Sequence, residues 1–540
     1  MAAVPDSDFQ SVIGRNPHLG SYIEEIKKDG RIPDFTPGLD RSDRDRDPLN
    51  LIYPVGDPIF IHLTKDRFGQ NLYRAIEPGL NDDDQEKYER ILDRVLMTAH
   101  EDEIPETDEE METLLEGKLT QLTSVGKATG GLLGGAKVDL SIHQFDKIKY
   151  LFIRDLIGSG RVEPVIRDPY IEDIHCVGTG PIFIEHKVFG RCKTSIAFDK
   201  DEDLDSYVRA MSERIGKPVS DTNPIIDATL PDGSRINMVY SREISKNGSS
   251  FTIRKFAGVP LSIVQLVNWK TLSAQVAAYL WLCLENGISI FVCGETASGK
   301  TTVLNAMSAF IRPNAKLFTV EDVAEAQIPH EAWQRLLTRE SGTSGGRVEM
   351  FDLLKAALRS RPNYIIVGEI RSKEGAVAFQ GMQTGHPVMA TFHASSVRKM
   401  IQRLTGDPIN VPETFIDNLN IALIQQAIYR NGKLLRRTTG IEEIEGYSTE
   451  AGGVLTRNVF TWVPYSDKHE FRGMYNSYIL EEKIATMRGL SDKREIYEHL
   501  ALRTRIIEEM INRKIFDYYK VFEIIKSFNQ GGVEALPFPL

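Results

Sequence analysis

The sequence predicts an α/β protein, and three observations support that class. The chain has 540 residues, 41% of them hydrophobic and 26% charged, so it is long enough for several domains with cores of their own. An apolar run over 288–293 is typical of a buried parallel strand, and a glycine-bounded turn over 294–301 and an amphipathic helical pattern over 303–311 follow it. Between 140 and 256, alternating segments joined by Gly and Asn turns predict an antiparallel sheet with helices on one face.

The N-terminal part of the chain is polar and predicts less order. We expect the first 47 residues, with their alternating Asp and Arg, to be loosely ordered. A charged helix is expected over 82–100, and the glycines between 123 and 135 indicate a linker. We divide the chain into a loose segment 1–47, a small domain with acidic and glycine-rich linker 48–135, an α+β domain 140–256, a linker 257–262 and an α/β domain 263–540.

The C-terminal part predicts regular structure without a motif that names a function. A helix is expected over 415–429, and strands over 433–439 and 454–463. Helices over 481–488, 493–512 and 516–528 follow, and the apolar stripe in the last of them forms either core packing or a partner-docking face.

Charge and cysteine content exclude several classes of protein. The net charge is −11, and residues 81–116 hold 15 Asp/Glu and 3 Lys/Arg, so the rest of the chain is near neutral. This distribution argues against a globally basic nucleic-acid binder, and the acidic stretch is either a solvated helix face or a docking surface.

Four cysteines without a C-x-x-C pair support neither a disulfide framework nor a zinc cluster. No apolar run is long enough to span a bilayer, so we expect a cytoplasmic protein.

The turn after the apolar run has the G-x-x-x-x-G-K-T spacing of a phosphate-binding loop. Gly294 and Gly299 let the backbone N–H groups point inward, Lys300 can reach the β- and γ-phosphates, and the Thr301 hydroxyl can hold Mg²⁺. ATP and Mg²⁺ are therefore the expected ligands. The predicted nucleotide-binding residues are Gly294, Glu295, Thr296, Ala297, Ser298, Gly299, Lys300, Thr301 and Thr302.

Acidic residues end two further predicted strands of this domain. One strand delivers Glu321, Asp322 and Glu325, and the other, over 363–369, stops at Glu369. Ligands of open α/β sheets bind at the carboxyl ends of the strands, so these carboxylates are placed for Mg²⁺ or water. Beyond them, His386 and His393 flank a short strand and could sense the γ-phosphate.

The order of these motifs resembles that of the type II/type IV secretion ATPase superfamily. Its Walker A motif corresponds to 294–301, its acidic box to 321–325, its Walker B motif to 365–369 and its histidine box to 385–393. Further segments are most similar to the archaeal branch, and within it to the archaellum (archaeal flagellum) motor and assembly ATPases. They are Ala277–Leu282, the loop itself, Leu304-Asn305 and Ser250–Arg254. The chain lacks the four clustered cysteines of bacterial pilus-extension ATPases, and Val323 stands where the acidic box commonly has Pro.

The resemblance implies a fold and a set of roles. It implies a homo-hexameric ring in which a RecA-like ATPase domain follows a PAS-like domain, with ATP bound between them. Glu325 or Glu321 would be the general base, Glu369 would support metal and water, and His393 would contact the γ-phosphate region. Arg235 and Arg254, with Arg242 behind them, match the arginines that complete the site, although each could instead be a surface arginine paired with an acid.

The resemblance also implies partners. ATP hydrolysis would power assembly or rotation of an archaeal type IV pilus-like filament through a polytopic membrane platform protein, with the motor at the inner face of the membrane. The acidic segment and the N-terminal region are the candidate contacts, and deletion of residues 1–120 is expected to leave ATPase activity largely intact. The alternatives are an adhesive-pilus or type II secretion ATPase, a nucleic-acid translocase, and a nucleotide-dependent interaction module without turnover.

Overall fold

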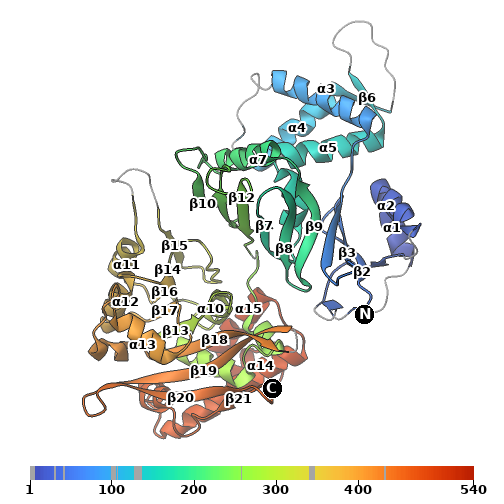
Figure 1. Ribbon diagram of the computed structural model, residues 1–540. Helices are drawn as coiled ribbons and strands as arrows, with labels where there is room; N and C mark the ends of the chain where they lie inside the picture. The colour runs from blue at the N-terminus through green and yellow to red at the C-terminus, as the bar shows by residue number, and fades with distance from the viewer. Residues whose placement is uncertain are drawn as a thin grey trace. The chain divides into compact units, whose positions relative to one another are not determined.

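The computed structural model describes the chain in two units, residues 1–256 and 257–540 (Figure 1). Within them it describes residues 6–28, 32–40, 43–44, 46–98, 105, 107–126, 137–256, 258–339, 347–430 and 433–540. Most of the predicted glycine-rich linker and part of the acidic stretch lie outside these ranges. No helix in the described ranges is long and apolar enough to cross a membrane.

The first unit is built on one ten-stranded sheet of order β1-β2-β3-β4-β9-β8-β7-β12-β11-β10. Neighbouring strands of this sheet are antiparallel, except for two parallel pairs, β1 with β2 and β4 with β9. The antiparallel sheet predicted for 140–256 is therefore present, and β2–β4 extend it at the β9 edge. The strands are β1 (Asp34–Phe35), β2 (Asn50–Pro54), β3 (Phe60–Lys65), β4 (Asn71–Ile76), β7 (Ile171–Cys176), β8 (Gly180–His186), β9 (Gly190–Phe198), β10 (Ile225–Thr229), β11 (Arg235–Val239) and β12 (Ser250–Arg254).

Helices cover the first unit in separate groups. Leu19 and Ile23 of α2 pack on Ile52, Phe60 and Ile76 of the sheet, so the segment expected to be loose contains two helices beside β2 and β3 (Figure 1). Its few apolar residues fall on one helix face, which the sheet buries. The helices are α1 (Asp6–Arg15), α2 (Pro17–Lys27), α3 (Asp82–Thr98), α4 (Asp108–Leu122), α5 (Ile142–Leu156), α6 (Glu163–Arg167) and α7 (Asp201–Arg214), with a small sheet of β5 (Thr123–Val125) and β6 (Val138–Leu140).

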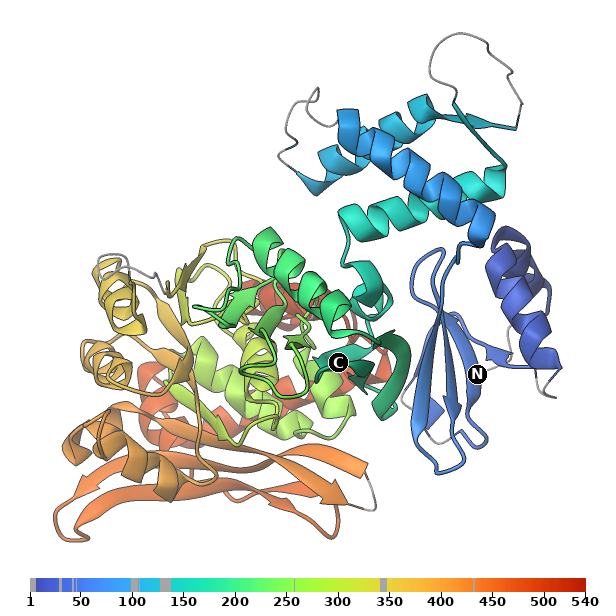
Figure 2. The same ribbon diagram turned by 45° about the horizontal axis from the view of Figure 1, so that its top comes forward.

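The second unit is built on a nine-stranded sheet of order β15-β14-β16-β17-β13-β18-β19-β20-β21. The strands from β15 to β18 are parallel, and those from β18 to β21 are antiparallel and include a long ribbon (orange in Figure 2). The strands are β13 (Ile290–Gly294), β14 (Leu317–Glu321), β15 (Trp333–Leu337), β16 (Tyr364–Ile370), β17 (Val388–Phe392), β18 (Ile421–Arg430), β19 (Lys433–Ser448), β20 (Gly453–Val463) and β21 (Lys468–Phe471).

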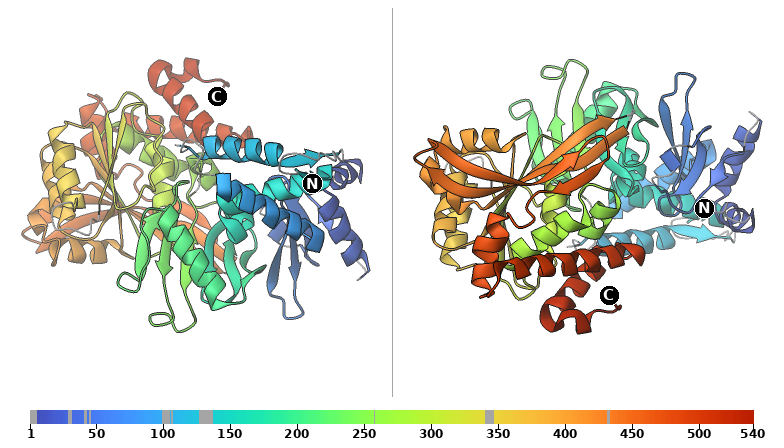
Figure 3. Two further views of the ribbon diagram at one scale, coloured as in Figure 1. Left: turned by 90° about the horizontal axis from the view of Figure 1, so that it is seen from above. Right: turned by 90° about the horizontal axis from the view of Figure 1, so that it is seen from below.

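Helices lie on both faces of this sheet and bury two cores. One core joins it to α11–α13, and the other joins it to α8–α10 and to the C-terminal helices α14 and α15 (red in Figure 3). Three residues of the predicted C-terminal stripe, Tyr518, Phe522 and Ile525, are buried in the core, whereas the fourth, Tyr519, is 51% exposed. The helices are α8 (Ile263–Asn268), α9 (Ala274–Glu285), α10 (Lys300–Ser308), α11 (Met350–Arg359), α12 (Glu374–Gln383), α13 (Val397–Thr405), α14 (Ile496–Asn512) and α15 (Tyr518–Gly531), with a π-helical turn at Ile479–Ala485.

One predicted element of the second unit is wrong. The helix expected over 415–429 is a short 3-10 turn, Glu413–Asn418, followed by strand β18. The segment Ile421–Ile424 is a continuous apolar run that is buried between β13 and β19. Such a run has no period that separates a buried strand from a buried helix, so the sequence pattern was ambiguous here.

Candidate functional site

The phosphate-binding loop joins the end of β13 to the start of α10, as predicted. Gly299 caps α10 with φ of +92°, a left-handed conformation that favours glycine. A Cβ at Gly294 would lie 2.4 Å from the backbone oxygen of Gln425, so the close approach of β18 requires glycine there too. Both glycines of the motif are therefore needed by the backbone.

Two side chains brace the loop from within. Ser298 Oγ donates to the backbone oxygen of Glu295 at 2.8 Å, and Lys300 Nζ donates to the same oxygen at 2.9 Å. Burial lowers the pKa of Lys300, while the carboxylate of Glu369 acts in the opposite direction. Since α10 begins at Lys300, its unpaired N–H groups and its dipole favour an anion at the same place.

Glu321, the last residue of β14, is almost fully buried, with 1% of its surface exposed. Its Oε1 accepts hydrogen bonds from the backbone N–H groups of Glu325, at 3.0 Å, and Ala326, at 2.6 Å. Its Oε2 is buried without a hydrogen-bond partner in the described residues. Burial raises the pKa of Glu321 to about 7, so this carboxyl group exchanges its proton near neutral pH.

Glu325 brings the acidic box to the loop. Thr301 Oγ1 donates to Glu325 Oε2 at 3.2 Å, and Asn305 Nδ2 donates to the Glu325 backbone oxygen at 2.9 Å. Thr301 and Asn305 lie one helical turn apart on α10, so one helix face contacts Glu325 through both its carboxylate and its backbone oxygen. The sequence pattern pointed to both acids but not to this difference between them: Glu325 faces the loop hydroxyl and Glu321 holds the turn behind it.

Glu369 lies near the end of β16, beside β14. Its Oε2 accepts from Arg371 Nε at 2.8 Å, and Arg371 also pairs with Asp322 at 3.8 Å. Gly368 lets β16 pass close to Glu321 on β14, because a Cβ at Gly368 would come within 3.1 Å of the Glu321 side chain. Arg371 was not among the predicted site residues, and its only sequence signal is a basic residue two positions after the strand-end acid.

The two histidines of the third motif do not lie together. β17 pairs with β13 so that Phe392 lies beside Cys293, and His393 therefore follows at the same edge as Gly294. His386 precedes β17 at the opposite edge, where its Nδ1 lies 3.1 Å from Thr384 Oγ1. The two histidines thus flank β17 as predicted, but at opposite ends of the strand, so only His393 lies at the edge of the phosphate loop. A role of either histidine in sensing the γ-phosphate stays a prediction.

The predicted arginines belong to the first unit. Arg235 and Arg254 are cross-strand partners on β11 and β12. Arg254 Nε lies 3.4 Å from Asp173 Oδ1, and its side chain is 53% exposed. Arg242 pairs with Asp201 at 2.8 Å. Arg254 and Arg242 thus each form an ion pair with an acidic residue of the first unit. A role of Arg235, Arg254 or Arg242 in binding the nucleotide stays a prediction.

The residues at this edge fit a magnesium nucleotide. The helix N-terminus and Lys300 suit a polyphosphate, and the Thr301 hydroxyl and the Glu369 carboxylate are the kind of oxygen donors that Mg²⁺ prefers. The Thr301–Glu325 contact shows that hydroxyl and carboxylate oxygens already converge there. The arrangement can bind a nucleoside triphosphate and hold a base next to its terminal phosphate.

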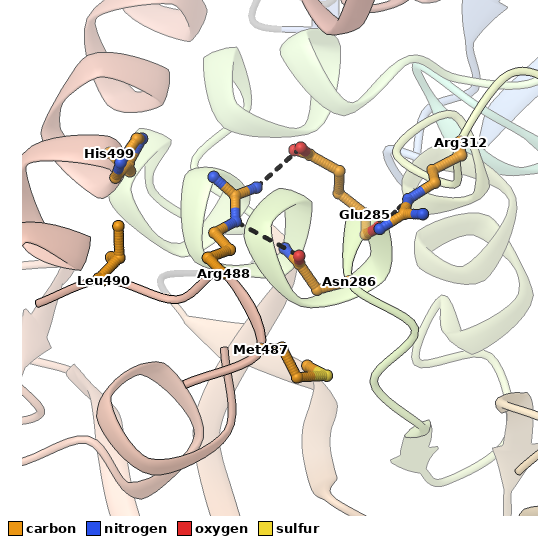
Figure 4. A pocket seen from close by; sticks show the side chains of 7 residues that line it. All are labelled: Glu285, Asn286, Arg312, Met487, Arg488, Leu490 and His499. Carbon is orange, nitrogen blue, oxygen red and sulfur yellow. Dashed lines mark hydrogen bonds and ion pairs between the residues drawn. The ribbon is translucent and has the colours of Figure 1, made fainter. Parts of the chain in front are cut away.

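A separate cavity of about 550 Å³ lies where α9 ends, near the start of β13 rather than at its loop end (Figure 4). Arg488 Nη2 donates to Glu285 Oε1 at 2.8 Å, and Arg503 Nη2 donates to Glu285 Oε2 at 2.7 Å. Arg312 Nε donates to the Glu285 backbone oxygen at 2.7 Å. None of the predicted site residues lines this cavity. The ion pairs of Glu285 with Arg488 and Arg503 connect α9 to the C-terminal part of the chain.

Comparison with known proteins places the chain in a family. The chain matches the family described as type II/IV secretion system protein over residues 155–436, more than half of its length. It is 54% identical to the uncharacterized protein MJ0900 of Methanocaldococcus jannaschii, over 99% of each chain. It is 27% identical to protein VirB11 of Agrobacterium fabrum, over 42% of this chain and 74% of that one.

A similarity to solved structures accompanies these matches. The ATPase DotB of Legionella pneumophila is 17% identical, with 66% of this chain and 92% of that chain covered and a TM-score of 0.38. The family match spans the phosphate loop, the acidic box, Glu369 and His393. This chain therefore belongs to the type II/IV secretion system protein family.

Proposed function

We propose that the protein is an ATP-hydrolysing motor that works as a ring of six copies. The observation that carries this proposal is the contact of Thr301 Oγ1 with Glu325 Oε2, 3.2 Å apart, at the edge where the phosphate loop and Glu369 also lie. A module that only binds nucleotide needs the loop but not a carboxylate beside it. Membership of a family that includes secretion ATPases supports the same reaction.

In this proposal the chain's own residues have distinct tasks. Lys300 and the loop amides bind the phosphates, and the Thr301 hydroxyl and Glu369 would hold the metal. Bound Mg²⁺ would offset the charge of the β- and γ-phosphates. Glu325 accepts a proton from the attacking water, and His393 lies at the same edge to contact the γ-phosphate region.

Glu325 is the proposed general base, and Glu321 is its positioning residue. Glu325 faces the Thr301 hydroxyl, whereas Glu321 is buried and accepts the backbone N–H groups of the turn that carries Glu325. The pKa of Glu321, raised to about 7, suits a group that is partly protonated inside the fold. We further propose that Arg235 and Arg254 approach the nucleotide when the two units close in the ring, where a guanidinium suits the spread charge of the transition state.

The work done by the motor is assembly or rotation of an archaellum. The similarity to an archaeal protein over nearly the whole chain and the archaeal features of the sequence support this choice. In this proposal the protein lies in the cytoplasm against the inner face of the membrane, where a polytopic platform protein and other motor components receive the motion. An adhesive-pilus or type II secretion ATPase would have the same active site and is the alternative.

A complementation experiment tests the proposal in cells. A strain lacking this gene would receive the wild-type gene, the Lys300→Ala variant, or a Lys399→Ala control, in which an exposed lysine of α13 loses its contact with Ser395. We expect wild type and control to restore swimming filaments and Lys300→Ala to restore none, as seen by electron microscopy and motility assays. Loss of adhesive pili or of secretion with normal swimming would contradict the archaellum role.

A further inference from the structure

The strands β18 and β19 form a ribbon that begins beside the phosphate loop, although β18 starts 120 residues after Thr301. β18 pairs in parallel with β13, with Gln425 beside Gly294, and β19 returns antiparallel to β18 with Arg436 opposite Ala427. The β18–β19 register shifts between Ile424 and Gln425. Such irregularities re-aim side chains and are frequent near active sites.

Arg436 holds the outer turn of the loop. Its Nε donates to the backbone oxygen of Ala297 at 3.0 Å, and its Cδ would lie 3.4 Å from a Cβ at Gly299. Ala297 has φ of +60°, a left-handed conformation that is unfavourable for a residue with a side chain. A hydrogen bond from a charged donor to this peptide therefore favours a backbone conformation that the chain would not keep by itself.

Gln425 lies beside the other end of the loop and is fully buried. Its Oε1 accepts from Thr438 Oγ1 at 2.9 Å, while its Nε2 is buried without a hydrogen-bond partner in the described residues. That nitrogen lies 3.9 Å from the position of a Cβ at Gly299. An unpaired buried amide is costly to stability, so its presence beside the loop calls for a functional reason.

We propose that Arg436 is a positioning residue of the phosphate loop, which keeps Ala297 left-handed so that the loop amides are preorganised for nucleotide, and that the unpaired Gln425 amide nitrogen is a donor held next to the loop for the nucleotide-bound state. This inference rests on the proposed nucleotide site. Preorganisation matters because the apparent affinity falls by the fraction of molecules whose loop has the binding conformation.

The test measures ADP binding and ATP hydrolysis by the full-length protein. We expect Arg436→Ala to raise the Kd for ADP and the KM for ATP about tenfold and to leave kcat within about twofold, since saturating nucleotide itself orders the loop. The matched control is Arg430→Ala, which removes an arginine of the same ribbon that donates to the Pro464 backbone oxygen at 2.6 Å. An unchanged Kd and KM, or a loss of kcat alone, would overturn the positioning role.

Two further variants separate geometry from charge. Arg436→Lys keeps the charge but loses the Nε donor, so we expect it to resemble Arg436→Ala, and full wild-type affinity would show that only charge matters and overturn the proposal. Gln425→Met has similar volume and no amide, and we expect about threefold weaker ADP binding without a lower Tm. Wild-type affinity with a higher Tm would overturn the part assigned to Gln425.

The outcome for the nucleotide site itself is read from Lys300→Ala in the same assay. If wild type binds ADP and Lys300→Ala does not, the site stands, and the Arg436 and Gln425 variants decide this inference alone. If Lys300→Ala binds ADP like wild type, the proposed nucleotide site itself is wrong, whatever the Arg436 and Gln425 variants show.

Discussion

At the scale of single residues, Glu321 connects stability to pH. Its pKa is about 7 in the folded protein against 4.5 for an ordinary glutamate, so the protonated form favours folding. This stability is fully present below about pH 4.5 and is lost as pH rises through 7, with a total on the order of 3 kcal/mol. We therefore expect the Tm of a Glu321→Gln variant to gain on that of wild type between pH 4.5 and 7.

Thermal unfolding of both proteins from pH 4.5 to 8 measures this effect. Any cost of the introduced amide is the same at every pH. The change with pH in the Tm difference between variant and wild type therefore reports the titration of Glu321. A difference that does not change with pH would mean that Glu321 is ionised in the folded state with an ordinary pKa.

The sequence allowed prediction of the loop and of the acids at the strand ends, because those residues are local in the chain and have chemistry of their own. Arg371, Gln425 and Arg436 were missed for different reasons. Arg371 acts through ion pairs with Glu369 and Asp322, which spacing alone does not reveal. Gln425 and Arg436 reach the loop only because β18 pairs with β13, and a pairing between strands so far apart in the chain is not visible as a local pattern.

At the scale of elements, Glu285 at the end of α9 joins this helix to the C-terminal part of the chain. It accepts from Arg488 and from Arg503, whose side chain is 4% exposed. Arg503 also lies over the rings of Trp281 and Phe528. Glu285→Ala would leave a buried guanidinium without its anion, so we expect the free energy of unfolding to fall by about 3–5 kcal/mol.

Chemical denaturation of the variant measures this loss, and Glu523→Ala is a control that removes an exposed acid of α15 from a surface pair. The control is expected to change stability by less than about 1 kcal/mol. Equal stability of Glu285→Ala and wild type would show that α14 is held by apolar packing alone.

Element types were predictable where polar residues set a period, and unpredictable where burial is complete. The charged helix expected over 82–100 is α3, because its polar and apolar faces alternate with helical spacing. The segment that became β18 is buried on both sides over its first half, so it has no polar face from which its period can be read.

At the scale of the whole molecule, the N-terminal region is part of the first unit's core. Tyr53 and Tyr73, from β2 and β4, donate to Asp168 Oδ2 at 2.6 and 2.9 Å. All three residues are fully buried, and Tyr53 and Tyr73 belong to the same apolar cluster as β7–β9. The expectation that residues 1–120 form a removable docking segment conflicts with this packing.

Deletion of residues 1–120 is therefore expected to unfold the first unit and to abolish ATPase activity, not only the proposed partner binding. The deletion exposes one edge of β9 and leaves Asp168 without two hydrogen-bond donors. Tyr73→Phe is the milder companion, with an expected cost of about 1–2 kcal/mol in unfolding free energy. Circular dichroism and soluble yield decide the outcome, and a soluble deletion protein with wild-type ATPase activity would contradict it.

The proposed reaction is ATP hydrolysis with Glu325 as the general base beside Thr301. Single-turnover hydrolysis of ATP by wild type and Glu325→Gln, with ADP binding measured on the same samples, tests it most directly. We predict that Glu325→Gln binds ADP within about threefold of wild type and hydrolyses ATP at least about 100-fold more slowly, the range for loss of a general base. Hydrolysis at the wild-type rate by Glu325→Gln would contradict the claim.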